Sequence, residues 1–176
     1  MDQPAPHEQE RGVAPSEPAS WPQPTPGAAG EMVGTGPAYP PVVAHGLQMK
    51  RRNPAAVWIG LPLITLGIYH LVWYYKIHHE MGQFDPRRTV PDVGPMLVLL
   101  LLGWTVIAPL ISYYNCGNRI ANAQRAAGLQ PTCSGVIGML LMFVFGLGTL
   151  YYQVELNRVH DVYRGAPAGA QVPLYV

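Results

Sequence analysis

The sequence predicts an all-α membrane protein with three transmembrane helices, short amphipathic helical extensions and a disordered proline- and glycine-rich tail in front of them. Three observations lead to this prediction. Three long runs of the 176-residue chain contain no charged residue, and each run closes on a pair of tyrosines. Ten of the nineteen prolines fall in the first 46 residues, ahead of all three runs.

The expected tail covers residues 1–49. Its first 46 residues hold one basic residue, Arg11, against five acidic residues, so this part carries a formal charge of −4. Proline removes backbone donors, glycine raises the entropy cost of ordering, and the apolar residues occur singly, so we expect no hydrophobic core here. Such a composition favours a solvated spacer, although polyproline stretches can also dock in a groove of a partner protein.

The three uncharged runs are long enough to cross a bilayer. They cover about residues 55–75, 93–114 and 133–153. Crossing about 30 Å of hydrocarbon takes roughly twenty helical residues at about 1.5 Å each. Pro62 and Pro109 lie inside the first two runs, and each removes one backbone donor, so we expect a kink at both prolines.

Aromatic and basic residues mark the expected membrane interfaces. Tyrosine and tryptophan rings prefer the headgroup zone with their polar tip toward water, and lysine and arginine at helix ends reach toward the headgroups. The residues expected in this zone are Lys50, Arg51, Arg52, Trp58, Trp73, Tyr74, Tyr75, Tyr113, Tyr114, Tyr151 and Tyr152.

The helical membrane domain is expected over residues 50–164, followed by a short flexible C-terminal tail at 165–176. Basic residues at 50–52 directly precede the first helix, which is typical of a cytoplasmic flank. Counted over the whole domain, five basic residues fall on each side, so the orientation depends on the first helix. The prediction is a multi-pass protein of the cell membrane with a cytoplasmic N-terminus, and three spans place the C-terminus outside.

The tyrosine pairs recur at intervals of 39 and 38 residues, which suggests a unit of one helix plus a polar extension, used three times. Coincidence stays open, because a transmembrane helix plus a loop often approaches forty residues. In two extensions, apolar residues fall on one helical face, so amphipathic helices are expected. These residues are Ile120, Ala123 and Ala127 after the second run, and Leu156, Val159 and Tyr163 after the third.

Three stretches resemble the bacterial membrane family called domain of unknown function 4234: RRNPAAVWIGLPLITLGIYHLVWYYKIHHEM, SYYNCGNRIANAQRAAGL and FGLGTLYYQVELNRV. The resemblance covers about residues 50–160. It implies a compact helical membrane domain, and it supplies no catalytic residue. Relatives more often have Asn-Arg-Glu after the first tyrosine pair, where this chain has residues His-His-Glu at 78–80, so a role for the Asn-Arg positions stays open.

The runs contain little that could carry chemistry. His70 is the only histidine inside them and is the candidate intramembrane polar residue, either as a proton acceptor or ligand or, as we favour, as a neutral side chain bonded to a neighbour. Neighbouring residues on a helix point about 100° apart, so positions 78–80 form no metal clamp. Cys116 and Cys133 form no CxxC motif. We expect no catalytic residue, no metal site and no cofactor.

Glycines indicate where helices approach one another. Gly60 and Gly67 share a face of the first expected helix, and Gly135, Gly138 and Gly146 share a face of the third. Small residues let helices pack closely in lipid, either within one chain or between copies. A homo-oligomer is therefore one option, and packing within the chain explains the pattern equally well.

A chemically quiet bundle joined to an acidic, proline-rich tail favours a non-enzymatic membrane anchor or scaffold with a cytoplasmic interaction tail. The alternative is a small oligomeric channel or transporter subunit, favoured by the glycine faces, the expected kinks and His70. The expected partners are the lipid bilayer, a second copy of the chain and a protein that binds the tail. Nucleic acid is not expected, because the tail is acidic and the basic residues lie next to the membrane.

Overall fold

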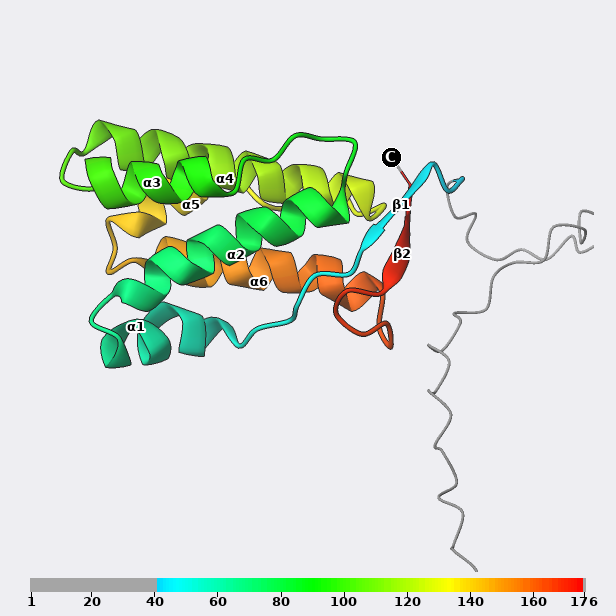
Figure 1. Ribbon diagram of the computed structural model, residues 1–176, viewed down its shortest axis with the longest axis horizontal. Coiled ribbons are helices and arrows are strands. Elements are labelled where there is room, and N and C mark those ends of the chain that lie inside the picture. Colours follow the sequence, from blue (N-terminus) through cyan, green and yellow to red (C-terminus); the bar gives the residue numbers. More distant parts are fainter. Residues whose placement is uncertain (1–40, 176) are drawn as a thin grey trace, which may run out of the picture. The chain divides into compact units, whose positions relative to one another are not determined.

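The computed structural model describes residues 41–175, so the expectation of a disordered tail lies outside the described residues for positions 1–40. Within 41–175 the chain is mostly helical, as predicted (Figure 1). The elements in order are β1 (Ala44–Leu47), the π-helical turn η1 (Ala56–Gly60), α1 (Leu61–Ile64), α2 (Ile68–Phe84), α3 (Val93–Leu102), α4 (Ile107–Ala126), α5 (Gly135–Met142), α6 (Leu147–Val162) and β2 (Gln171–Leu174).

Each of the three apolar runs folds as a helical hairpin. The first run divides between η1–α1 and the start of α2, the second between α3 and α4, and the third between α5 and α6. All three turns lie at the same end of the bundle, on the left in Figure 1. The prediction of three continuous helices is therefore wrong. Among the described residues, no helix combines the length and the apolar character that crossing a bilayer requires.

The breaks in the helices do not coincide with the prolines at which kinks are expected. The chain turns at residues 65–67, 103–106 and 143–146. Pro109 instead lies in the first turn of α4, where a proline is well tolerated because the first backbone N–H groups of a helix have no partner within the helix. The predicted kink at Pro109 is therefore wrong. Pro62 lies where the π-helical turn η1 continues directly into α1, so the helix changes its hydrogen-bonding pattern next to this proline.

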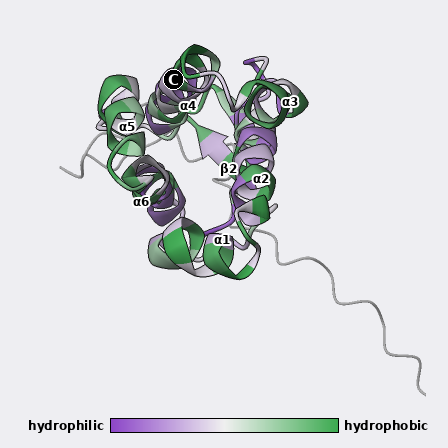
Figure 2. Cartoon of the chain, turned by 90° about the vertical axis from the view of Figure 1, so that its left-hand side faces the viewer, coloured by the Kyte–Doolittle hydropathy of each residue, from purple (hydrophilic) through white to green (hydrophobic). Residues whose placement is uncertain are grey.

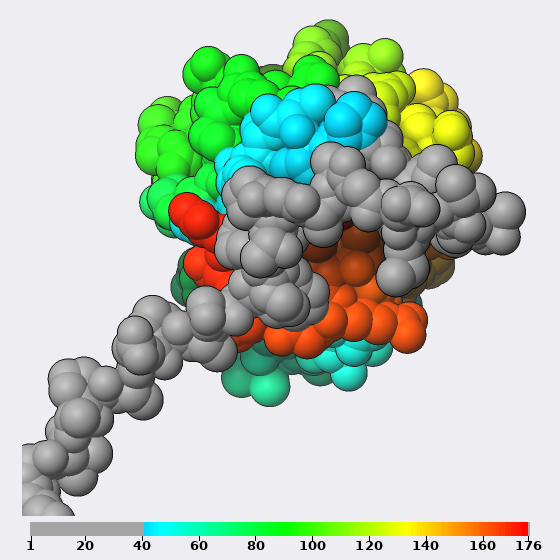
Figure 3. Space-filling model, turned by 90° about the vertical axis from the view of Figure 1, so that its right-hand side faces the viewer, coloured from blue at the N-terminus to red at the C-terminus, as the bar shows by residue number. Residues whose placement is uncertain are grey.

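A two-stranded antiparallel sheet closes the opposite end of the bundle, which Figure 3 faces. Ala44 pairs with Leu174, and Val172 and Leu174 are buried. The prediction of flexible segments is therefore wrong for 41–49 and 165–175. The predicted placement of the C-terminus across the membrane from the N-terminal segment is wrong as well, because two strands that pair cannot lie on opposite sides of a bilayer.

The core is formed by the long arms of the hairpins, α2, α4 and α6, in the half of the bundle away from the turns. η1–α1 packs between α2 and α6, α3 packs on α2 and α4, and α5 packs on α4 and α6, so the helices form the ring seen in Figure 2. The predicted amphipathic extensions are confirmed, since all six residues of their apolar faces are buried: Ile120, Ala123, Ala127, Leu156, Val159 and Tyr163.

Candidate functional site

The end of the bundle that carries the hairpin turns directs its apolar side chains outward. We call this surface the apolar cap and define it as residues 59–68, 97–111 and 136–145. None of the three ranges contains a charged residue, and each exposes large aliphatic or aromatic side chains. Figure 2 looks onto this end, where α1, α3 and α5 are mostly hydrophobic. An apolar surface of this extent is typical of a site that contacts a membrane or another protein.

The most exposed side chains lie at the three turns. Leu66 is 93% exposed, Trp104 84% and Phe145 90%. Leu66 and Phe145 have φ angles of 51° and 50°, in the left-handed region that bulky residues rarely adopt. Such a conformation costs on the order of 1–3 kcal/mol, and burial within the chain does not compensate for it here. Two bulky apolar residues are thus held at the tips in spite of strain, which points to a role outside the isolated chain.

Side-chain donors satisfy backbone carbonyls at all three turns. The bonds run from Thr65 Oγ1 to Leu61 O (2.8 Å), from Thr105 Oγ1 to Leu102 O (2.7 Å), from Trp104 Nε1 to Leu101 O (3.0 Å) and from Trp58 Nε1 to Phe145 O (2.9 Å). In hydrocarbon no water can bond a free carbonyl, so a turn placed there needs donors from the protein itself. Trp58 keeps some exposure while its indole bonds the third turn, and its place at a membrane interface stays a prediction.

His70 joins all three hairpins just below the cap. Its Nε2 lies 2.6 Å from Tyr113 Oη on α4, and its Nδ1 lies 3.5 Å from Thr149 Oγ1 on α6. The prediction that His70 is bonded to neighbours is therefore confirmed. The contacts tie α2, α4 and α6 together, and they point into the bundle.

Further polar groups in this half of the bundle also face inward and pair. Trp73 Nε1 donates to Gln153 Oε1 at 2.8 Å, and Tyr74 Oη bonds the hydroxyl and the carbonyl of Ser112 at 2.9 Å. Apolar side chains thus cover the outside of the cap while polar side chains bond one another inside. This is the reverse of the distribution that water favours, and it is the distribution expected in lipid.

The tyrosine pairs divide between the interior and the surface. Trp73, Tyr74 and Tyr152 are fully buried, so the prediction that their rings lie in a headgroup zone is wrong. Tyr152 instead packs between hairpins, and its hydroxyl donates to Tyr113 O at 2.6 Å. The other rings keep some exposure, namely those of Tyr75, Tyr113, Tyr114 and Tyr151.

The basic residues at 50–52 lie at the polar end, where Arg51 and Arg52 pair with acids. Arg51 Nε lies 3.3 Å from Asp161 and stays largely exposed. The Arg52 side chain is only 10% exposed, and its guanidinium binds both carboxylate oxygens of Glu80. Arg52 therefore ties the segment before η1 to α2, while Lys50 and Arg51 remain at the surface.

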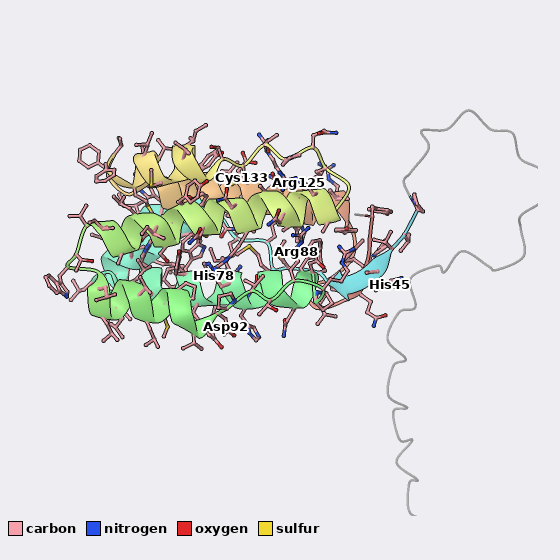
Figure 4. The ribbon with its side chains drawn as sticks, turned by 90° about the horizontal axis from the view of Figure 1, so that it is seen from above. His45, His78, Arg88, Asp92, Arg125 and Cys133 are labelled. Carbon is pink, nitrogen blue, oxygen red and sulfur yellow. The ribbon has the colours of Figure 1, made fainter. Side chains whose placement is uncertain are left out.

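Residues 78–80 point to three different partners. His78 is buried between α2 and α4, where its Nδ1 lies 2.8 Å from Tyr74 O (Figure 4). Burial lowers the pKa of His78 to about 4. His79 faces outward and lies 3.0 Å from Asp92, while Glu80 binds the guanidinium described above. The three side chains thus stabilise separate contacts.

Two of the predicted packing glycines are confirmed. A Cβ at Gly135 would lie 2.4 Å from Tyr114 O, and a Cβ at Gly138 would lie 2.1 Å from the Tyr152 ring. Sequence reasoning missed Gly117, where a Cβ would lie 2.4 Å from Gly135 Cα. These glycines let α4, α5 and α6 approach closely within one chain.

The other three glycines do not have the predicted packing role. Gly67 and Gly146 have positive φ angles of 87° and 69° and form the first and third hairpin turns. Glycine adopts this conformation at no steric cost, which is why it follows the bulky residue in each turn. Gly60 meets only the Cβ of Ala56 in its own helix, 4.0 Å away.

Sequence reasoning also missed Arg119 as a site residue. Its Nη1 is buried and has no hydrogen-bond partner within the described part of the chain. The repeated Asn-Arg pair was the available signal. In the second Asn-Arg pair, Asn157 stabilises the fold because its amide bonds the backbone of Arg52, whereas Arg158 stays exposed.

The geometry defines a helical bundle of three hairpins that carries an apolar cap at one end and paired strands at the other. Residues 53–122, from just before η1 to late in α4, match the family described as Domain of unknown function (DUF4234). The predicted resemblance to this family is therefore confirmed over residues 53–122. No curated protein and no solved structure matches the chain.

Proposed function

We propose that the chain is a non-enzymatic membrane anchor that inserts its apolar cap into one leaflet of the cell membrane. The observation that supports this most is the inverted end of the bundle, with uncharged, outward apolar side chains over inward, paired polar ones. Exposed apolar surface is unfavourable in water and favourable in hydrocarbon. Insertion would also account for the strained, exposed residues Leu66 and Phe145 at the tips.

The dimensions of the hairpins fit one leaflet. The short arms α3 and α5 contain ten and eight residues, so they are about 15 and 12 Å long at about 1.5 Å per residue. One leaflet supplies roughly half of the ~30 Å hydrocarbon core. Tyr75 and Tyr114 follow the tips by nine and ten residues, so in the proposed orientation they would lie near the headgroups, where tyrosine rings are favoured.

The polar end then remains on the side from which the hairpins insert. β1 and β2 lie there together, so both ends of the described chain share that side. The basic residues at 50–52 favour the cytoplasmic side. Residues 1–40, acidic and proline-rich by sequence, precede β1 in the chain and would supply the segment through which the anchor binds a protein partner.

The alternative of a small oligomeric channel or transporter subunit stays a prediction with no observation that favours it. The polar side chains inside the bundle bond one another, as His70 does with Tyr113. The close glycine contacts at Gly135 and Gly138 lie within one chain. A homo-oligomer likewise stays a prediction.

Protease protection tests the proposal. Different epitope tags at the two termini of the full chain are exposed to protease in spheroplasts and in inverted inner-membrane vesicles. We expect both tags to be cleaved only in the inverted vesicles, and the membrane-embedded part to resist carbonate extraction. Cleavage of the two tags from opposite sides, or release by carbonate, would contradict the proposal.

A further inference from the structure

A groove of about 400 Å³ runs between α3 and α4 and is not explained by anchoring alone. Its lining on α3 and just before it is apolar and includes Pro95 and Val98. On α4 it is lined by Ala108 and Ile111, and then by polar residues toward Arg119. A volume of this size lies within the roughly 300–1,000 Å³ range of small-molecule sites.

The groove has an apolar end and a cationic end. Ala108 lies beside the second hairpin turn, and Arg119 lies eleven residues further along α4, about 16 Å away at about 1.5 Å per residue. Side chains on a helix lean toward its N-terminus, which for α4 is the cap. The guanidinium therefore reaches back into the groove at the depth where lipid headgroups begin.

The charge of Arg119 is not matched by an acid within residues 41–175. Its Nη1 is buried without a hydrogen-bond partner. Asp85 shares a small adjoining cavity with Arg119, but its carboxylate pairs with Arg87 and Arg88. Asp92 bonds His79 and the first N–H of α3. A buried guanidinium nitrogen without an acceptor is costly, so an anion at this place would stabilise it.

We propose that the groove binds one anionic phospholipid, with its phosphate on Arg119 and one acyl chain between α3 and α4, directed toward the cap. This inference depends on the proposed function, because it takes the lipid from the leaflet that the cap enters. The polarity of the groove runs the same way as the polarity of that leaflet. Guanidinium binds phosphate through parallel hydrogen bonds, which a lysine cannot do.

The test uses the full chain reconstituted in nanodiscs of neutral phosphatidylcholine with a minor fraction of phosphatidylglycerol. Native mass spectrometry of the released protein counts the phosphatidylglycerol that stays bound. We expect one molecule on the unaltered chain and at least about a tenfold loss for Arg119→Gln, because a buried charge-assisted bond disappears. Arg125→Gln is the matched control, since Arg125 is exposed on the same helix and bonds Asn122.

The outcomes separate the lipid site from the anchor. If Arg119→Gln retains phosphatidylglycerol as the unaltered chain does, the groove proposal is overturned while the anchor stands. If millimolar inorganic phosphate displaces the lipid completely, the site binds free anions and the proposal fails. If the unaltered chain does not associate with any bilayer, the anchor proposal fails first. Flotation of Arg119→Gln with neutral liposomes, unchanged from that of the unaltered chain, shows that the variant still folds and inserts.

Discussion

Replacing the two strained tip residues by asparagine should separate membrane binding from folding. Leu66 and Phe145 have φ angles near +50° and almost fully exposed side chains. Asparagine tolerates the left-handed region better than either residue. The double variant Leu66→Asn/Phe145→Asn should therefore fold at least as stably as the unaltered chain, because no packed side chain is lost and the backbone strain is lower.

The same variant should bind membranes much more weakly. Burying a leucine or phenylalanine side chain in hydrocarbon contributes about 1.5–3 kcal/mol to the free energy of membrane binding, so losing both side chains should weaken binding by roughly 3–6 kcal/mol. At about 1.4 kcal/mol for each factor of ten, bilayer partitioning should fall by roughly a hundredfold to ten-thousandfold. Asparagine in hydrocarbon would lower it further.

Liposome flotation of the purified full chain measures the partitioning, and thermal unfolding followed by circular dichroism measures the stability. The control is Val42→Asn/Val162→Asn, which replaces two apolar residues of 50% and 39% exposure away from the hairpin turns. We expect the control to float like the unaltered chain. Unchanged flotation of the tip variant would refute the role of the cap, and a large loss of stability would refute the argument from strain.

Three further predictions concern the fold that holds the cap in place. Burial lowers the pKa of His78 to about 4, against 6.5 in the unfolded chain, so the unfolded state binds a proton first as pH falls. The free energy of unfolding should therefore decrease between pH 6.5 and 4 by up to roughly 3 kcal/mol. Chemical denaturation across this range should show a flatter profile for His78→Gln, and an equally steep one would contradict the assignment. Gly138→Ala would place a Cβ against the buried Tyr152 ring and should lower the free energy of unfolding by about 1–3 kcal/mol. Gly60→Ala, which has open space, should be neutral or stabilising by up to about 1 kcal/mol. Equal melting temperatures of the two variants would show that the contact at Gly138 is unimportant. Glu80→Gln should lower the free energy of unfolding by about 1–3 kcal/mol, because its partner Arg52 is largely buried. Asp161→Asn, whose partner Arg51 is exposed, should lower it by less than about 1 kcal/mol. The reverse order in denaturant titrations would contradict this interpretation.

The sequence predicted the helices of the polar half because their pattern is local. Ile120 and Val159 lie on apolar stripes that repeat with the helical period, and such a stripe indicates its buried face without knowledge of the partner helix. The hairpins could not be predicted in the same way. A run of uncharged residues looks the same whether the helix continues or turns back, and Leu66 and Phe145 are not residues that normally form turns.

The contacts that define topology were hidden for a different reason. β1 and β2 pair across about 130 residues, and each contains or adjoins glycine or proline that suggests a loop. The buried state of Tyr74 and Tyr152 also depends on which hairpins pack together, since an interfacial tyrosine and a buried one have the same sequence context. Arg119 was read as part of a repeated pair, because only the packing of α3 on α4 shows that its guanidinium lacks an acid.

The depth of the three hairpin tips in a bilayer tests the central claim most directly. Single variants Leu66→Cys, Trp104→Cys and Phe145→Cys carry a nitroxide label in the reconstituted full chain, and Val42→Cys is the reference at the polar end. The native thiols Cys116 and Cys133 are buried, so the introduced thiol is the accessible one. The relative accessibility of the label to oxygen and to a water-soluble nickel chelate gives the depth. The anchor account predicts that all three tips lie in hydrocarbon near the bilayer centre, about 15 Å below the headgroups on the side of the reference. Labels at the tips that are accessible to the nickel chelate, from either side of the bilayer, would contradict it.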